Sequence, residues 1–402
     1  MISCNVHFRE DSIWRRYDTG YLTVWSVGSI ALLNHLYSIT EHDFSELIRE
    51  VDHVVKSQYS CFGLIIKSVH GCIAVSDQVR SHPVYFAQQT DCLSLANHPS
   101  LLIDSDSEPE ISQEALDEYL MSGYVHGGST LLSSVKQLRA GEILRYSFRD
   151  RKPVLERYFR YLPKANAGIQ GSKSTQNWIN EFDSVLNRAF ERALEDIGEA
   201  PIWVPLSGGL DSRLVLCKCL ELRGGDITAF SYGVSGNHEM RMAKRVARKL
   251  GVPWHAVPSD LKNLQALYQS KERQDYARLT DGFNAVPSYL DFEAIRKLKK
   301  NGVLPLDATI INGYSGDFLF GGHIPEKIRQ VPTLQTLVDA LVDKHCSHFT
   351  TLDFAQIKQK IAKKVQDEVA SVLDDVTSEE QLCSAYEYWD WQERQAKAVV
   401  NA

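Results

Sequence analysis

The chain has 402 residues, of which 44% are hydrophobic and 24% charged, and its formal net charge is −7. This composition is typical of a soluble globular protein with room for two domains, and the acidic balance argues against nucleic acid as the main partner. No apolar run is long enough to span a bilayer, and the eight cysteines form no Cys-x-x-Cys pair. We therefore expect a cytoplasmic protein with reduced thiols and no membrane partner.

Short apolar runs separated by turn signals predict a mostly β domain over residues 1–160. The first residues have no apolar core, so we expect no signal peptide. A polar stretch rich in Gly, Ser, Lys and Asn follows, which predicts a linker over residues 161–175. The expected strands lie within residues 61–69, 71–77, 83–88 and 141–148.

Residues 176–402 form a second predicted domain of a different class. Residues 176–197 carry apolar side chains at helical spacing, and the chain then alternates between short apolar runs and helical patterns up to residue 312. Such alternation is typical of a parallel sheet with helices on its faces. From about residue 333 the pattern stays helical. The predicted fold class is therefore a two-domain α/β and α+β protein.

The segment between the first predicted strand of this domain and the next helix reads SGGLDS (residues 207–212). Ligands in parallel sheets lie at the carboxyl ends of strands, and a helix N-terminus offers free N–H groups to anions. The two glycines leave the backbone N–H groups accessible to an anion, the two serines add hydroxyl groups, and the aspartate could hold Mg²⁺. We therefore expect this segment to bind the phosphate chain of a ligand. The pattern is not a Walker loop. The residues concerned are Ser207, Gly208, Gly209, Asp211 and Ser212.

A second segment, NGYSGD (residues 312–317), followed by FLFGG, completes a resemblance to the asparagine synthetase family. That family pairs an S-G-G-x-D-S pyrophosphate loop with a later S-G-x-G-x-D-E-x-x-G-G motif. The resemblance implies an adenine-nucleotide α-hydrolase-like domain of the PP-loop type, with ATP and Mg²⁺ as cofactors and Asp211 and Asp317 as metal ligands. It also implies nucleotide contacts from Leu206, Ser207, Gly208, Gly209, Asp211, Ser212, Tyr232, Asn312 and Gly313.

Two departures from the family's second motif bear on the substrate, and a third position differs from the authentic synthetase itself. Asn312 replaces a serine, Phe318 replaces a glutamate, and Tyr314 stands where the authentic synthetase has a glutamate thought to handle protons. These departures leave the identity of the carboxylate substrate open. We expect the carboxylates of Asp211 and Asp317 to approach within roughly 10 Å if they share a magnesium ion.

The resemblance extends to other parts of the chain. Residues 77–87 and 119–147 are similar to the family's first domain and its inter-domain segment, and residues 393–402 resemble the helix whose lysine grips pyrophosphate, which makes Lys397 the catalytic candidate. Residues 315–322 and 391–397 look closer to relatives found beside bacterial surface-glycan genes. Glu239, at the start of a predicted helix, could contact the nucleotide or simply complement the helix dipole.

The family's first domain is an Ntn-hydrolase-like glutaminase whose cysteine becomes residue 1. Here Ile2 disfavours removal of Met1, Cys4 is internal, and the R-G and N-G-E-x-Y-N patterns are missing. We expect a degenerate glutaminase domain kept as a scaffold. The P-F-L-D turn that follows the lysine helix is also missing before Ala402, so we expect a C-terminal truncation.

The leading hypothesis is an AMP-forming amide ligase that adenylates a carboxylic acid, aspartate in the family, for attack by ammonia or another amine. Two alternatives remain open. The chain could be a non-catalytic or decayed nucleotide-binding remnant, or an amide ligase that acts on a surface-glycan sugar acid. A homodimer is a further possibility, and no nucleic-acid partner is expected.

Overall fold

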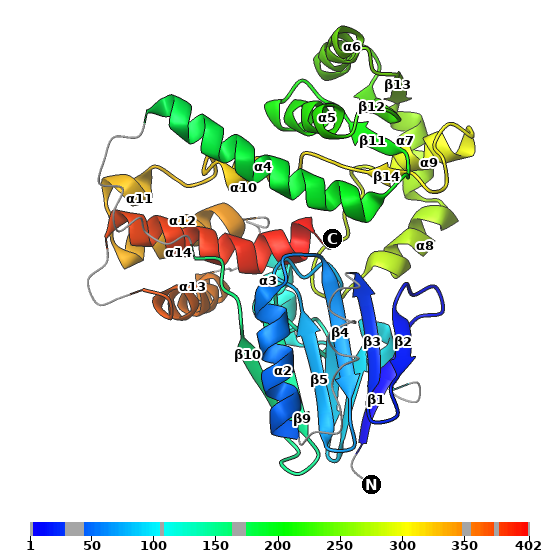
Figure 1. Ribbon diagram of the computed structural model, residues 1–402. Helices are drawn as coiled ribbons and strands as arrows, with labels where there is room; N and C mark the ends of the chain where they lie inside the picture. Colours follow the sequence, from blue (N-terminus) through cyan, green and yellow to red (C-terminus); the bar gives the residue numbers. More distant parts are fainter. Residues whose placement is uncertain are drawn as a thin grey trace. The chain divides into compact units, whose positions relative to one another are not determined.

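The computed structural model describes residues 3–28, 44–104, 108–162, 174–347, 355–373 and 378–400. The chain divides into two compact units (Figure 1). Unit 1 comprises Met1–Ala165, Thr280–Pro287 and Ile324–Ala402, and unit 2 comprises Asn166–Leu279 and Ser288–His323. Most of the predicted linker lies outside the described residues, as do Met1, Ile2 and Ala402. Among the helices that the structure describes, none is long and apolar enough to cross a membrane.

Unit 1 contains two β-sheets. The six-stranded sheet is antiparallel and has the order β10-β9-β5-β4-β3-β2, while the other sheet has the order β1-β7-β6-β8, in which only β1 and β7 are parallel. The strands are β1 (Ser3–His7), β2 (Arg15–Asp18), β3 (Thr23–Gly28), β4 (Phe62–Lys67), β5 (Gly71–Ser76), β6 (Tyr85–Gln89), β7 (Cys92–Ala96), β8 (Lys136–Gln137), β9 (Glu142–Ser147) and β10 (Pro153–Arg157).

The six-stranded sheet is buried on both faces. Leu64 and Ile66 of β4 pack with helix α2 (Phe44–Ser57), whereas Ile65, between them, packs into the core shared with the smaller sheet. This follows from the two-residue period of a strand, which sends successive side chains to opposite faces. Helices η1 (Pro99–Leu102) and α3 (Gln113–Ser122) lie between β7 and β8 along the chain.

The C-terminal helices belong to unit 1. They are α11 (Lys327–Gln330), α12 (Leu334–His345), α13 (Ala355–Ala370) and α14 (Glu379–Asp390), and α14 continues into a π-helical stretch, η2 (Trp391–Val399). Our sequence boundaries assigned residues 324–402 to the nucleotide-binding domain. The structure groups them differently, because the apolar faces of these helices share one core with Met121 and Tyr124 of the N-terminal part.

Unit 2 is built on a four-stranded sheet in which every neighbouring pair is parallel, with the order β13-β12-β11-β14. The predicted fold class is therefore confirmed: a β-rich N-terminal region and a parallel sheet further along the chain. The elements are α4 (Thr175–Ile197), β11 (Ile202–Pro205), α5 (Leu210–Leu222), β12 (Ile227–Val234), α6 (His238–Leu250), β13 (Trp254–Ser259), α7 (Leu261–Tyr268), α8 (Lys271–Thr280), α9 (Phe292–Lys300), β14 (Thr309–Ile310) and α10 (Gly316–Leu319).

Helices cover both faces of this sheet. Ile202 and Val204 of β11 pack with side chains of α4, α5 and α6, whereas Trp203 packs on the other face with Ala294 and Leu298 of α9. The sheet is thus buried on both faces, as expected for parallel strands joined by helical crossovers. This scaffold fixes the ends of β11 and β14, where the site lies.

Candidate functional site

The order of the strands in unit 2 creates a topological switch point. From β11 the chain passes through α5 to β12 on one side, and later returns to place β14 on the other side of β11. The connections that leave the carboxyl ends of β11 and β14 therefore diverge, and ligands in open parallel sheets bind at such a point. The SGGLDS segment follows β11, and the NGYSGD segment follows β14.

The SGGLDS segment is held by its own hydroxyl groups. Ser207 Oγ accepts a hydrogen bond from the Gly209 N–H at 3.0 Å and lies 3.0 Å from Ser212 Oγ, which also accepts from the Ser207 N–H at 3.1 Å. Gly209 is the N-cap of α5, and no side chain caps this helix. The first N–H groups of α5 can therefore serve an anion.

The NGYSGD segment contacts the SGGLDS segment through two glycines, which have no side chain. A Cβ atom on Gly313 would lie 2.8 Å from the Ser212 nitrogen, and one on Gly316 would lie 2.3 Å from the Asp211 carboxyl carbon. No side chain fits at either place. The two predicted segments are therefore in contact, and the Asp211 carboxylate lies against the second one.

A cavity of about 280 Å³ opens between these segments and the end of β12. It brings together eight of the residues predicted to bind ATP: Leu206, Ser207, Gly209, Asp211, Ser212, Tyr232, Asn312 and Gly313. Gly208 is adjacent, and its N–H donates to a carboxylate oxygen of Glu239. Pro205, Phe230, Ser231, Glu239 and Tyr314 complete the lining.

This geometry agrees with the comparison to protein families. The asparagine synthase family model matches residues 181–396, more than half of the chain. The chain belongs to the asparagine synthase family. The family assignment made from the two segments is thereby confirmed.

Individual relatives are distant. The asparagine synthetase (glutamine-hydrolyzing) of Sandersonia aurantiaca is 27% identical over 194 residues, which cover 42% of this chain and 35% of the relative. One such enzyme of Bacillus subtilis is 23% identical over 266 residues, covering 64% of this chain and 38% of the relative. The chain thus spans little more than a third of the length of these curated relatives. Among solved structures, an NH3-dependent NAD synthetase from Campylobacter jejuni matches at 13% identity with a TM-score of 0.24, covering 51% of this chain and 90% of that one.

Asp317, the second aspartate of the family motif, lies in the first turn of α10 and is exposed. It follows Gly316, the residue in contact with the Asp211 carboxylate, and consecutive Cα atoms are only ~3.8 Å apart. Its side chain is not part of the cavity lining. The expected approach of the two carboxylates stays a prediction.

Ser315 shows how tightly the turn before α10 is constrained. Its φ of 68° places it in the left-handed region, where residues other than glycine are uncommon. The family motif has a glycine at this position. The glycine of the family motif was the available sequence signal, since glycine is the residue that adopts a positive φ freely.

Asp291 is a residue beside the site that sequence reasoning missed. One of its carboxylate oxygens accepts from the Tyr232 hydroxyl at 2.5 Å and the other from the Tyr314 hydroxyl at 3.2 Å. Burial, followed by the contact with Asp291, raises the pKa of Tyr232. Burial also raises the pKa of Tyr314. No local sequence pattern predicts this role of Asp291, because its partners are distant in the chain: Tyr232 lies in β12, and Tyr314 follows β14.

The donor set of the cavity suits magnesium. The side chains that reach it offer carboxylate, hydroxyl and amide oxygens from Asp211, Glu239, Ser207, Ser212 and Asn312, and hard cations prefer oxygen ligands. Within the described ranges, His, Cys, Asp and Glu form no group of three or more that could hold a metal ion. Magnesium on a nucleotide needs no such group, because one or two carboxylates and the phosphates complete its shell.

Lys397, the predicted catalytic lysine, lies in η2 of unit 1 and is fully buried. Its ammonium donates to the Val125 carbonyl at 3.1 Å, to the Gly127 carbonyl at 2.7 Å and to the Glu393 carboxylate at 2.6 Å. An ammonium has three protons, so these three acceptors satisfy it. Burial lowers the Lys397 pKa, although Glu393 opposes this.

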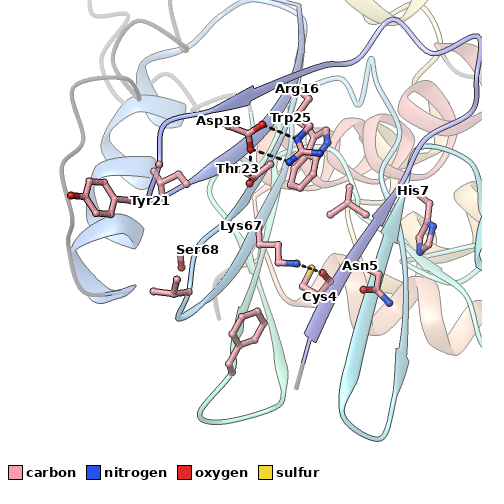
Figure 2. Close-up of a pocket in the computed structure, with 15 residues that line it drawn as sticks. Cys4, Asn5, His7, Arg16, Asp18, Tyr21, Thr23, Trp25, Lys67 and Ser68 are labelled. Carbon is pink, nitrogen blue, oxygen red and sulfur yellow. Dashed lines mark hydrogen bonds and ion pairs between the residues drawn. The ribbon is translucent and has the colours of Figure 1, made fainter. Parts of the chain in front are cut away.

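Cys4 lies in β1 beside a broad cavity of about 700 Å³ in unit 1. Figure 2 shows the Lys67 ammonium directed to the Cys4 carbonyl, a hydrogen bond of 2.8 Å. The Cys4 side chain is only 1% exposed and packs in the core between the sheets. A hydrogen bond with Cys4, together with burial, raises the pKa of Cys72. This core position is typical of a structural thiol.

Proposed function

We propose that this chain is an ATP-dependent, AMP-forming carbon–nitrogen ligase whose nucleotide binds in the cavity of unit 2. The observation that carries the proposal is the contact between the SGGLDS and NGYSGD segments at the switch point, which sets Asp211 beside a bare helix N-terminus. Membership of the asparagine synthase family supports it.

In this reaction a carboxylate oxygen of the substrate attacks the α-phosphorus of ATP, and the bond to the bridging oxygen of pyrophosphate breaks. The resulting acyl-adenylate is attacked by ammonia or an amine, which loses a proton as AMP leaves. The products are an amide, AMP and pyrophosphate. The protein contributes mainly by positioning the reactants and neutralising charge.

Several residues of the cavity, and Asp317 outside its lining, have a proposed task in that scheme. The N–H groups at the start of α5 and the hydroxyls of Ser207 and Ser212 bind the phosphate chain. Asp211 and Asp317 hold magnesium, which neutralises the charge that develops on the departing pyrophosphate. Leu206 and Tyr232, at the ends of β11 and β12, flank the adenine.

The role of Lys397 on pyrophosphate stays a prediction taken from the family. Its three present acceptors in unit 1 mean that binding pyrophosphate would require the exchange of at least one hydrogen bond. We propose a small carboxylic acid and ammonia or an amine as the other substrates. Aspartate, another amino acid and a sugar acid remain the candidates for the acid, because Asn312, Tyr314 and Phe318 differ from the family motif.

The test combines binding with turnover. Saturation of the native state at a hundredfold excess over Kd adds about 2.7 kcal/mol, so ATP with Mg²⁺ should raise the unfolding temperature of the wild type. Asp211→Asn should abolish that shift, whereas Asp196→Asn, an exposed change on α4, should keep it. Pyrophosphate release should then be measured with a panel of carboxylic acids and ammonium.

Two results would contradict the proposal. An unchanged thermal shift in Asp211→Asn would place the nucleotide elsewhere. Binding of ATP without pyrophosphate release from any acid of the panel would favour a non-catalytic nucleotide-binding protein.

A further inference from the structure

One of the backbone N–H groups that we assign to phosphate binding already donates a hydrogen bond to a carboxylate of the protein. The N–H of Gly208, the second residue of the SGGLDS segment, donates to Oε2 of Glu239. A Cβ atom on Gly208 would lie 3.0 Å from the same oxygen, so the carboxylate sits directly over the bare backbone. The glycine thus leaves room for an anion, and the anion present is Glu239.

The position of Glu239 is not explained by capping of its own helix. It lies in the first turn of α6, whose N-cap is Asn237, and the Asn237 side chain already accepts from the Met240 N–H at 2.7 Å. A carboxylate that only complements the helix dipole needs no contact with another loop. Glu239 instead bridges from α6 to the SGGLDS segment and lines the cavity.

The charge of the cavity is negative. Asp211 and Glu239 both line it, and of the described residues that line it none carries a positive charge. The guanidinium of Arg213, on α5, donates to the carbonyl oxygens of Gly208 and Gly209 at 3.0 Å each. A metal-free phosphate chain would therefore meet two carboxylates and compete with one of them for the Gly208 N–H.

We propose that Glu239 is an exchangeable carboxylate that makes this site selective for metal-bound phosphate chains. When a nucleotide binds, Glu239 releases the Gly208 N–H, which then donates to a phosphate oxygen. Together with Asp211, Glu239 then faces the Mg²⁺ that is bound to the nucleotide. The cation offsets the repulsion between the carboxylates and the phosphates, so the exchange is favoured for the metal complex. This inference rests on the proposed binding of ATP in the same cavity.

The test measures binding rather than turnover, by calorimetry with ATP and with pyrophosphate, each in Mg²⁺ and in EDTA. Glu239→Gln is the informative variant, because its amide oxygen still accepts from the Gly208 N–H while the charge is lost. Glu195→Gln, an exposed change on α4, alters the net charge equally and serves as control. Circular dichroism and the unfolding temperature of the ligand-free variants check that each is folded.

The wild type and Glu195→Gln should bind both probes at least tenfold more tightly with Mg²⁺ than in EDTA. In Glu239→Gln, metal-free binding should strengthen about threefold to tenfold, and a Mg²⁺ titration at fixed ATP should need severalfold more metal. If the ratio of the affinity in Mg²⁺ to the affinity in EDTA is the same in Glu239→Gln as in the wild type, and the wild type binds as expected, the role of Glu239 is refuted. The proposed nucleotide site is then unaffected. Failure of the wild type to bind either probe with Mg²⁺ overturns the proposed nucleotide site as well.

Discussion

Gly316 and Asp211 lie in direct contact, although 105 positions of chain separate them (316 − 211). A Cβ atom on Gly316 would come within 2.3 Å of the Asp211 carboxyl carbon and within 2.8 Å of both carboxylate oxygens. Gly316 is not one of the glycines with positive φ, so space rather than backbone conformation requires glycine there. The contact fixes the carboxylate between the two loops.

Gly316→Ala should therefore weaken nucleotide binding. The methyl group must displace either the NGYSGD segment or the Asp211 carboxylate, and overpacking of this kind costs about 1–3 kcal/mol. We expect the affinity for ATP with Mg²⁺ to fall at least tenfold, measured by calorimetry. Gly322→Ala is the control, because a Cβ atom there meets only the Asp317 carbonyl oxygen, at 4.0 Å. Equal affinities for the two variants would refute the importance of this contact.

The alternation of strands and helices in unit 2 could be predicted because each element carries its own local signal. β11 is a short apolar run, α6 begins after a capping asparagine and ends at Gly251, and the SGGLDS segment lies between a strand and a helix. The parallel order places the carboxyl ends of the strands on one edge. These two facts predicted that the SGGLDS residues bind a ligand, whereas Leu206, Tyr232, Asn312 and Gly313 of the cavity lining were expected from the family resemblance.

Other features depend on contacts between distant parts of the chain. The helices from residue 327 onward are amphipathic, but nothing in their period says which core they join. The structure places them with Met121 and Tyr124. The roles of Asp291 and Glu239 likewise arise from side chains that meet across loops.

The buried pair of Lys397 and Glu393 should be important for the stability of unit 1. Burial alone would raise the pKa of Glu393, but Lys397, His126 and the Gly127 N–H outweigh it and bring the pKa to about 2. Lys397→Met leaves a buried carboxylate without its cation, and breaking such a pair costs about 3–5 kcal/mol. Chemical denaturation should show this loss, and Lys397→Met combined with Glu393→Gln should recover part of it.

The exposed change Lys152→Met is the control for this pair and should cost less than about 0.5 kcal/mol. A loss below about 1 kcal/mol for Lys397→Met would mean that the ammonium is not neutralising Glu393 in solution.

His126 should make the stability of unit 1 depend on pH. Its ring is buried between Tyr124 and Trp389, neither ring nitrogen has a hydrogen-bond partner, and burial lowers its pKa despite the nearby Glu118 and Glu393. As the pH falls through about 6.5, the unfolded chain binds the proton first, so the free energy of unfolding decreases.

The unfolding temperature should therefore fall between pH 7.5 and pH 5.5, and less steeply in His126→Phe. Burial also lowers the pKa values of His82 and His98, so some dependence remains in the variant. The exposed change His7→Phe should leave the slope unchanged. A wild-type slope in His126→Phe would show that this ring does not contribute.

Cys4 should behave as a structural thiol and not as a nucleophile. Its side chain is 1% exposed, whereas Cys61 and Cys217 are exposed. Iodoacetamide should label Cys61 and Cys217 in the native protein well before Cys4, as mass spectrometry can show. The purified chain should release no glutamate from glutamine. Release that disappears in Cys4→Ser would instead identify a working glutaminase.

Asp291 accepts a hydrogen bond from each of the two tyrosines that line the cavity. Tyr232 lies near the carboxyl end of β12, Tyr314 belongs to the NGYSGD segment, and each hydroxyl donates to a different oxygen of the same carboxylate. Because the two tyrosines come from opposite sides of β11, Asp291 sets the distance between them. It thereby shapes the end of the cavity that we assign to the adenine.

Asp291→Ala should enlarge this end of the cavity and loosen both rings. The half-buried Tyr232 hydroxyl loses its acceptor, and leaving such a donor unsatisfied costs about 1–3 kcal/mol. We expect the affinity for ATP to fall about tenfold while the affinity for pyrophosphate stays within a factor of two, because the phosphate end is untouched. Asp291→Asn should lie between, since its amide oxygen still accepts one hydroxyl, and the exposed change Asp307→Ala should match the wild type. Calorimetry with the two ligands separates the outcomes. Equal losses for ATP and pyrophosphate would show that Asp291 supports the whole loop arrangement and not the adenine end.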